Sequence, residues 1–189
     1  MRRLLCFGDS NTYGYDPRSF AGGRYPSQVR WTGRMGPEYD VINAGQNGRM
    51  IPCRSAEYAE TADLLRRMGP VDLFSVMLGT NDLLNLATAE EAAERMRRFL
   101  EAVLPLVGNA RVLLIAPPPL RPGEWVTEPE MIDRSVRYAA LCGALARELG
   151  IDYADAGAWN VGLTFDGVHF SEEGHRAFAG GLRRHCGPR

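Results

Sequence analysis

The sequence predicts an α/β fold: a three-layer α/β/α sandwich with a central parallel sheet of about five strands. Short apolar runs of strand length alternate with longer segments of helical periodicity along the chain. One run, 71–78, is continuously apolar, as in a parallel strand that is buried on both faces. Polar stretches directly follow several of the runs. At 189 residues, the chain fits a single domain over residues 1–189.

The apolar runs are expected to form the strands of this sheet. The first run stops abruptly at Gly8, and the others are bounded by residues typical of turns. Because helical segments separate the runs, right-handed crossovers should join them into a parallel sheet. The expected strands are residues 3–7, 39–43, 71–78, 111–116 and 151–154.

The segments between the strands carry signals for the start and end of helices. Thr88, with Glu91 three residues later, is typical of a capping box, and Pro105 should disturb the last turn of that helix. Gly-Pro pairs or a single glycine end three other segments. The expected helices are residues 27–35, 55–68, 88–107, 129–149 and 171–184.

Four polar stretches lie at strand ends or helix starts: 8–11, 45–48, 79–82 and 166–169. Because the carboxyl ends of parallel strands share one edge of the sheet, where such folds bind ligands, we expect these stretches to converge. Ser10, in the first stretch, is a candidate nucleophile. Serine, aspartate and asparagine are also common turn residues, so this stretch taken alone favours an ordinary turn.

A serine nucleophile needs a base that a third group orients. His169 is the candidate base, because Asp166 can reach its ring Nδ1 across a turn and leave Nε2 for the serine proton. Taken alone, the Asp-x-x-His spacing is more typical of a turn before a helix. We expect His185 to face solvent and His175 to have a packing or surface role.

Acyl transfer also needs hydrogen-bond donors for the oxyanion. The backbone N–H groups of Ser10 and Gly48 are candidates, because glycine lets the backbone approach a ligand closely. The side-chain amide of Asn81 is a third candidate, with a loop cap as its alternative role. All these residues fall at strand ends on one predicted edge, which favours the catalytic interpretation.

Composition excludes several classes of protein. Lys and Arg number 22 against 23 Asp and Glu, so the chain has no basic field for nucleic acid. Cys6, Cys53, Cys142 and Cys186 form no Cys-x-x-Cys pair, so no metal site is expected. No apolar run reaches the length of a membrane span, and no signal segment precedes the first strand. We expect a cytoplasmic protein that acts on small neutral molecules.

These stretches resemble the conserved blocks of the SGNH (GDSL) hydrolases. Gly8-Asp9-Ser10-Asn11 is similar to block I, Gly48 falls at the glycine of block II, Gly79-Thr80-Asn81-Asp82 matches block III, and Asp166-Gly167-Val168-His169 matches block V. The resemblance covers nearly the whole chain. It implies the flavodoxin-like SGNH hydrolase fold and no cofactor. It also implies a catalytic triad of Ser10, His169 and Asp166, and an oxyanion hole formed by Ser10, Gly48 and Asn81.

Further segments look like the arylesterase/acyltransferase branch of that family: 6–10, 29–33, 77–82, 116–120 and 166–170. Two features depart from the pattern. Asn11 stands where the family name has leucine, which leaves the nucleophile in place, and the segment from Gly48 to Val71 looks shorter than in that branch. Substrate and oligomeric state therefore transfer poorly. The Gly-x-Ser-x-Gly elbow of α/β-hydrolases is absent, which argues against that fold.

Four residues near the predicted edge are candidates for substrate binding: Asp9, Asn11, Trp31 and Phe170. Tyr13 and Trp125 are further aromatic residues in this region. Core packing is the alternative role for the aromatic residues. Support of the nucleophile loop is the alternative for Asp9.

The resemblance implies a serine esterase that hydrolyses short-chain acetyl or aryl esters through an acyl-enzyme, with acyl transfer to alcohols as a second outcome. The alternative within the family is a carbohydrate acetyl-ester deacetylase. From another class, a flavodoxin-like module would bind a phosphate or nucleotide with the 8–14 loop. That alternative leaves Asn81, Asp166 and His169 unexplained. A homo-oligomer is a further expectation from the resemblance.

Overall fold

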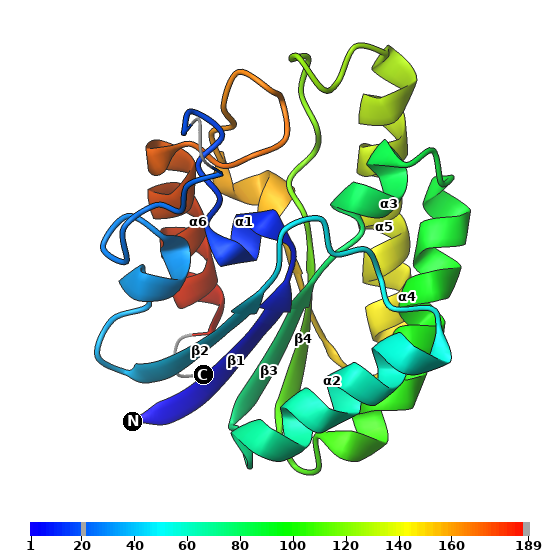
Figure 1. Cartoon of the computed structure of the whole chain (residues 1–189). Coiled ribbons are helices and arrows are strands. Elements are labelled where there is room, and N and C mark those ends of the chain that lie inside the picture. Colours follow the sequence, from blue (N-terminus) through cyan, green and yellow to red (C-terminus); the bar gives the residue numbers. More distant parts are fainter. Residues whose placement is uncertain (20–21, 187–189) are drawn as a thin grey trace.

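The computed structural model describes residues 1–19 and 22–186 and contains a five-stranded sheet (Figure 1). The strand order is β2-β1-β3-β4-β5, and every neighbouring pair is parallel. β1 therefore lies between β2 and β3. The strands are β1 (Arg2–Gly8), β2 (Tyr39–Gly45), β3 (Leu73–Met77), β4 (Arg111–Ala116) and β5 (Asp152–Asp155). The predicted parallel sheet is confirmed.

Six α-helices and three 3-10 helices connect and cover the strands in the described ranges. The α-helices are α1 (Ser10–Tyr13), α2 (Ser55–Met68), α3 (Thr80–Leu84), α4 (Ala89–Val103), α5 (Pro129–Leu149) and α6 (Glu172–Cys186). The 3-10 helices are η1 (Trp31–Arg34), η2 (Leu104–Leu106) and η3 (Ala156–Trp159). None of the helices in this part of the chain is both long and apolar enough to cross a membrane.

The helix predictions succeed where both end signals are strong. α2 and α5 have the predicted bounds, and the Thr88–Glu91 capping box is present at the start of α4. The predicted helix 27–35 is wrong, because only η1 forms there. Its backbone bonds span three residues, as in the bond from the Gly33 N–H to the Arg30 carbonyl.

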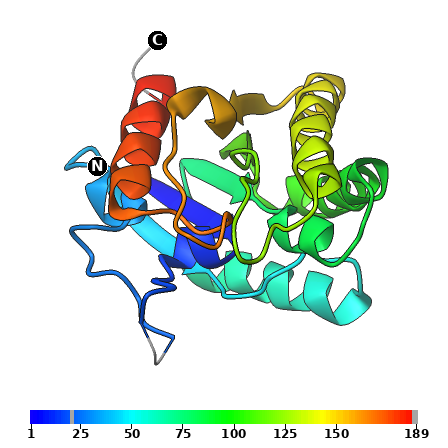
Figure 2. The same cartoon turned by 90° about the horizontal axis from the view of Figure 1, so that it is seen from above.

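Side chains alternate between two cores along each strand. Leu5 and Phe7 of β1 belong to the larger core, which α4 and α5 cover with α2. Leu4 and Cys6 point to the opposite face and pack with η1 and α6. Figure 2 shows α6 on one side of the sheet and α2, α4 and α5 on the other. These are the three layers that the alternating pattern predicts.

All four cysteines are free thiols. Cys6, Cys142 and Cys186 are buried, whereas Cys53 is exposed. Burial raises the pKa of Cys6 and Cys142 to about 12, so these two thiols stay protonated and act as small core residues.

Candidate active site

Ser10 opens the one-turn helix α1 at the carboxyl end of β1, which Figure 1 shows directly above that strand. Asp9 caps the helix, because its Oδ1 accepts the Asn11 N–H at 2.9 Å. Gly14 ends the helix in a left-handed conformation with φ 90°, and its N–H donates to the Ser10 carbonyl. The strand, the cap and the turn together hold Ser10 in a nearly buried position.

Two neighbouring glycines make room for α1. Gly8 and Gly45 are paired in the register of β1 and β2. A Cβ on Gly8 would lie 2.1 Å from Thr12 Oγ1, and one on Gly45 would lie 2.1 Å from the Tyr13 nitrogen. Because any larger residue would clash, these glycines let α1 sit directly on the ends of two strands.

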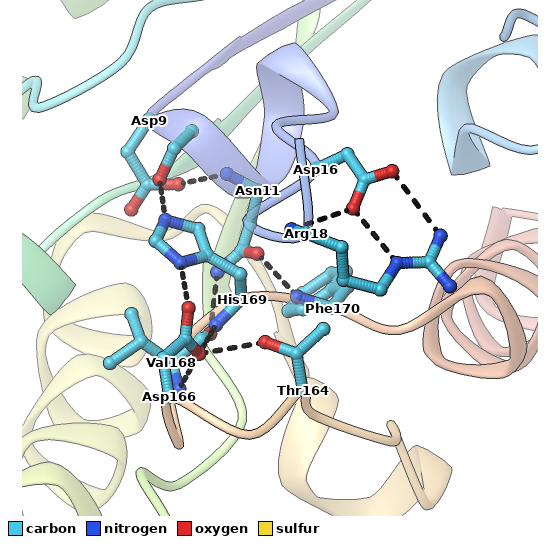
Figure 3. Close-up of polar contacts among 10 residues, drawn as sticks. Asp9, Asn11, Asp16, Arg18, Thr164, Asp166, Val168, His169 and Phe170 are labelled. Atoms are coloured by element: carbon cyan, nitrogen blue, oxygen red, sulfur yellow. Dashed lines mark hydrogen bonds and ion pairs between the residues drawn. The ribbon is translucent and has the colours of Figure 1, made fainter. Parts of the chain in front are cut away.

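Ser10, His169 and Asp166 form one continuous hydrogen-bonded chain. Ser10 Oγ lies 3.0 Å from His169 Nε2, and His169 Nδ1 lies 2.6 Å from Asp166 Oδ2, a contact that Figure 3 shows. An ionised carboxylate can only accept, so Nδ1 carries the ring proton and Nε2 accepts from the serine hydroxyl. This is the arrangement in which histidine can take a proton from serine.

The Asp166 carboxylate is saturated with hydrogen bonds. Oδ1 accepts from the backbone N–H groups of Val168 and His169 at 2.9 and 3.0 Å and from Thr164 Oγ1 at 2.8 Å. Burial raises the pKa of this carboxyl, but the bonds from the His169 ring and the two backbone N–H groups outweigh it and lower the pKa to about 2. Asp166 is therefore ionised at neutral pH and keeps the imidazole oriented.

Asp9 is a second buried carboxyl, directly before Ser10, and its environment has the opposite effect on its pKa. Burial raises its pKa to about 6, against smaller lowering effects that include the Asn11 N–H bond and the charge of Arg49. Asp9 and Asp166 thus differ strongly in acidity. Burial is the largest influence on both carboxyls and prevails at Asp9, whereas the hydrogen bonds to Asp166 outweigh it.

The loop after β2 and the start of α3 meet beside the end of β1. The Arg49 guanidinium donates to the Gly8 carbonyl at 2.8 Å, and the Arg49 carbonyl accepts from Asn81 Nδ2 at 3.0 Å. Gly48, just before Arg49, has φ 70°, which favours glycine. The stretches that carry Ser10, Gly48 and Asn81 are therefore linked by hydrogen bonds. The second N–H of the Asn81 amide gives this group a further donor.

Two residues that the sequence analysis did not single out support this loop. Arg49 connects it to β1, and Asp82 holds the next turn. Asp82 Oδ2 accepts the Ile51 N–H at 2.9 Å, and Oδ1 accepts from Arg95 Nη1 at 2.9 Å. Both lie next to predicted site residues, since Arg49 follows Gly48 and Asp82 follows Asn81. This position next to a motif residue is the signal in the sequence that could have identified both residues.

Two aromatic rings flank the His169 imidazole. The Tyr15 ring centroid lies 4.8 Å from that of His169, and the Trp125 ring meets it edge to face at 5.1 Å. The Trp125 side chain is half exposed. Its loop is held to the His169 loop, because the Trp125 N–H donates to the Asp166 carbonyl at 3.1 Å. Sequence reasoning missed Tyr15 and placed Trp125 only near the edge.

The four residues predicted to bind substrate are buried and engaged by internal contacts. Trp31 is 1% exposed and Phe170 is 0% exposed, and both rings pack on Phe178. Asn11 binds the backbone on either side of His169, and Asp9 caps α1. We therefore assign these side chains to support of the site, which corrects the prediction of substrate contact.

His175 lies in the core, which agrees with a packing role. It is 1% exposed, and its Nδ1 accepts the Trp31 N–H at 3.3 Å. Burial, followed by the charges of Arg34 and Arg30, lowers its pKa to about 3, so the ring is neutral. In its place in the core, His175 cannot serve as the base for Ser10.

A hollow near the site lies beside Gly48, between the loop after β2 and α2. It has a volume of about 770 Å³, and Gly48, Arg49, Glu57 and Glu60 are among its lining residues. Neither Ser10 nor His169 lines it, so the hollow is separate from the hydrogen-bonded chain described above. Within residues 1–19 and 22–186, no group of three or more His, Cys, Asp or Glu side chains could hold a metal ion.

Comparisons with known proteins agree with this geometry. The structure is similar to a carbohydrate acetylesterase from Sinorhizobium meliloti, with 28% identity, a TM-score of 0.84, and 98% of each chain covered. It is also similar to the aryl esterase of M. smegmatis, with 30% identity, a TM-score of 0.81, and 98% of each chain covered. A putative arylesterase from Agrobacterium tumefaciens matches with 30% identity, a TM-score of 0.84, and 97% of each chain covered.

No curated protein matches the chain. The model of the GDSL-like lipase/acylhydrolase family, in contrast, matches residues 6–177. This range contains every residue of the Ser10, His169 and Asp166 chain and the stretches of Gly48 and Asn81. The chain belongs to the GDSL-like lipase/acylhydrolase family.

Proposed function

We propose that this chain is a serine esterase that hydrolyses short-chain acetyl or aryl esters through an acyl-enzyme. The observation that carries the proposal is the alignment of Ser10 Oγ, 3.0 Å from His169 Nε2, with Asp166 on the other side of the ring. Ser10 attacks the ester carbonyl while His169 takes its proton and Asp166 stabilises the resulting imidazolium. The N–H groups of Ser10 and Gly48 and the Asn81 amide bind the oxyanion.

The alcohol part of the ester lies on the His169 side, because His169 returns the proton to the leaving oxygen. Tyr15 and Trp125 flank this side, so an alcohol with a flat ring face, aryl or sugar, can pack on them. The similarity to aryl esterases and to a carbohydrate acetylesterase supports both kinds of ester. In acyl transfer, a second alcohol replaces water at the same place. Cytoplasmic location and a homo-oligomer remain predictions.

The phosphate-binding alternative has no supporting observation. Residues 10–13 form α1, and the Asp9 carboxyl caps its N-terminus. A phosphate at this helix end would have to replace the Asp9 carboxyl as the acceptor of the Asn11 N–H. The negative charge of the carboxyl would also repel it. An ester carbonyl carries no such charge.

The test is the removal of the nucleophile. Ser10→Ala should lower kcat for p-nitrophenyl acetate by at least about 10³-fold and abolish labelling by a fluorophosphonate. Ser75→Ala is the matched control, because Ser75 is also buried but lies inside β3, where its hydroxyl donates to the Leu5 carbonyl. This control should keep both activities. Substantial turnover by a folded Ser10→Ala variant would refute the proposal.

A further inference from the structure

We propose that Asn11 is a positioning residue that sets the distance between Ser10 and His169. Its side-chain amide binds the backbone on both sides of His169, as Figure 3 shows. Nδ2 donates to the Val168 carbonyl at 3.1 Å, and Oδ1 accepts the Phe170 N–H at 2.9 Å. The inference rests on the proposed esterase function, because it concerns the same nucleophile and base.

The two bonds follow the pattern of a parallel β-bridge. In that pattern, one residue uses its N–H and C=O to bind the residues before and after its neighbour on the next strand. The Asn11 amide supplies the same donor and acceptor, with His169 as the neighbour between the two contacts. The side chain thus acts as a one-residue strand that aligns the histidine with the nucleophile helix.

Asn11 is itself held at both ends of its backbone. Its N–H donates to Asp9 Oδ1 at 2.9 Å, and its carbonyl accepts from Trp31 Nε1 at 2.9 Å. All three residues are at most 4% exposed. A side chain anchored in this way has little freedom to move. Since Asn11 directly follows Ser10, its anchoring also fixes the position of the nucleophile.

Few hydrogen bonds join α1 to the histidine loop, residues 164–170, in the described part of the chain. In the described part of the chain, the two Asn11 bonds and the Ser10–His169 bond are the hydrogen bonds that join α1 to residues 164–170. Asp166 orients the ring from within the same loop, because the hydrogen bonds of its carboxylate go to residues 164, 168 and 169. The distance between Ser10 and His169 therefore depends on Asn11.

Leucine, which the family name has at this position, could fill the space but could not make these bonds. In this chain, Asn11→Leu would leave the buried Val168 carbonyl and Phe170 N–H without their partners, and the loop would move to regain them. A displacement of reacting groups by about 1 Å can lower a rate by about 10²-fold. We expect a loss of that size in kcat, with little change in KM.

The experiment compares three variants with p-nitrophenyl acetate and a fluorophosphonate. Asn11→Leu should lower kcat and the labelling rate by about 10²-fold each, with KM within about threefold of the original value. Asn11→Asp has nearly the same size and keeps the acceptor for the Phe170 N–H but loses the donor to the Val168 carbonyl. It should lower kcat by at least about tenfold.

Asn43→Leu is the matched control. The Asn43 amide also ties α1 to the protein, because Nδ2 donates to the Thr12 carbonyl at 2.8 Å and Oδ1 accepts the Gly45 N–H at 2.9 Å. The hydrogen bonds of the Asn43 side chain go to Thr12, Thr32 and Gly45, none of which belongs to the histidine loop. This variant should lower the melting temperature and leave kcat within about threefold.

Two results would overturn the inference. The first is a folded Asn11→Leu or Asn11→Asp enzyme whose kcat stays within about threefold of the original. The second is an equal loss of kcat in Asn43→Leu, which would assign the effect to general anchoring of α1. If Asn11→Leu does not fold, the kcat of Asn11→Asp alone tests the inference. Absence of Ser10 labelling in the unmodified enzyme would instead refute the proposed esterase function.

Discussion

The buried carboxyl of Asp9 gives a quantitative prediction for stability. Asp9 is 1% exposed, and burial raises its pKa from the ordinary value of 3.8 to about 6. A carboxyl whose pKa is higher in the folded state opposes folding once it ionises. The difference between the two values, at about 1.4 kcal/mol per pH unit, corresponds to about 3 kcal/mol. Asp9→Asn removes this charge and keeps an oxygen that can cap α1.

The free energy of unfolding of Asp9→Asn should therefore exceed that of the unmodified protein by about 3 kcal/mol at pH values well above 6. The gain should shrink as the pH falls from about 6 to 3.8 and disappear below that window, because Asp9 is then protonated in both states. Urea unfolding of both proteins, followed by circular dichroism at several pH values above, within and below this window, measures the difference in the free energy of unfolding. A gain that does not change with pH, or no gain in alkaline buffer, would refute the reasoning.

Three further predictions concern Asp166 and Trp125. Asp166→Asn should lower kcat for p-nitrophenyl acetate by about 10⁴-fold, since an amide can donate to Nδ1 and favour the wrong tautomer. The ionised Asp166 should also stabilise the fold by about 2 kcal/mol above its ordinary pKa of 3.8, and this contribution should be lost as the pH falls towards about 2. The free energy of unfolding of Asp166→Asn should not show this decrease between pH 3.8 and about 2. The same decrease in both proteins during acid unfolding would contradict the prediction. Trp125→Ala should raise KM for phenyl acetate about three- to tenfold more than KM for ethyl acetate, because the ring contact is lost only for the aryl alcohol. Equal changes for both esters in steady-state assays would show that Trp125 does not contact the alcohol part.

Much of the sheet and of the hydrogen-bonded triad follows from local patterns in the sequence. The strand 111–116 and the helices α2 and α5 were predicted with their observed bounds, because Gly69 and Gly150 end the helices clearly. The convergence of Ser10 with His169 follows from the rule that parallel strands share one carboxyl edge. Short elements were missed. α1 and α3 are one-turn helices that directly continue polar strand ends, and their residues are equally typical of turns.

The walls of the site were less predictable, because they depend on how the loops pack. Trp31 and Phe170 were predicted to contact substrate, but their rings turn into the core beneath α6. Tyr15 has no neighbouring motif, and only the path of its loop brings the ring to His169. Asn11 is the most instructive case. Its departure from leucine was visible in the sequence, whereas the two backbone groups that it binds lie 157 and 159 residues further along the chain.

The sequence separation within the triad has a consequence for how the enzyme matures. Ser10 directly follows β1, and His169 lies 159 residues later, after β5 and before α6. The other four strands of the sheet therefore lie between them in the chain. In a nascent or partly refolded chain, Ser10 therefore lacks the His169 partner that the proposed mechanism requires. During refolding, esterase activity should therefore recover only when the complete sheet has formed. Circular dichroism also detects helices that form earlier.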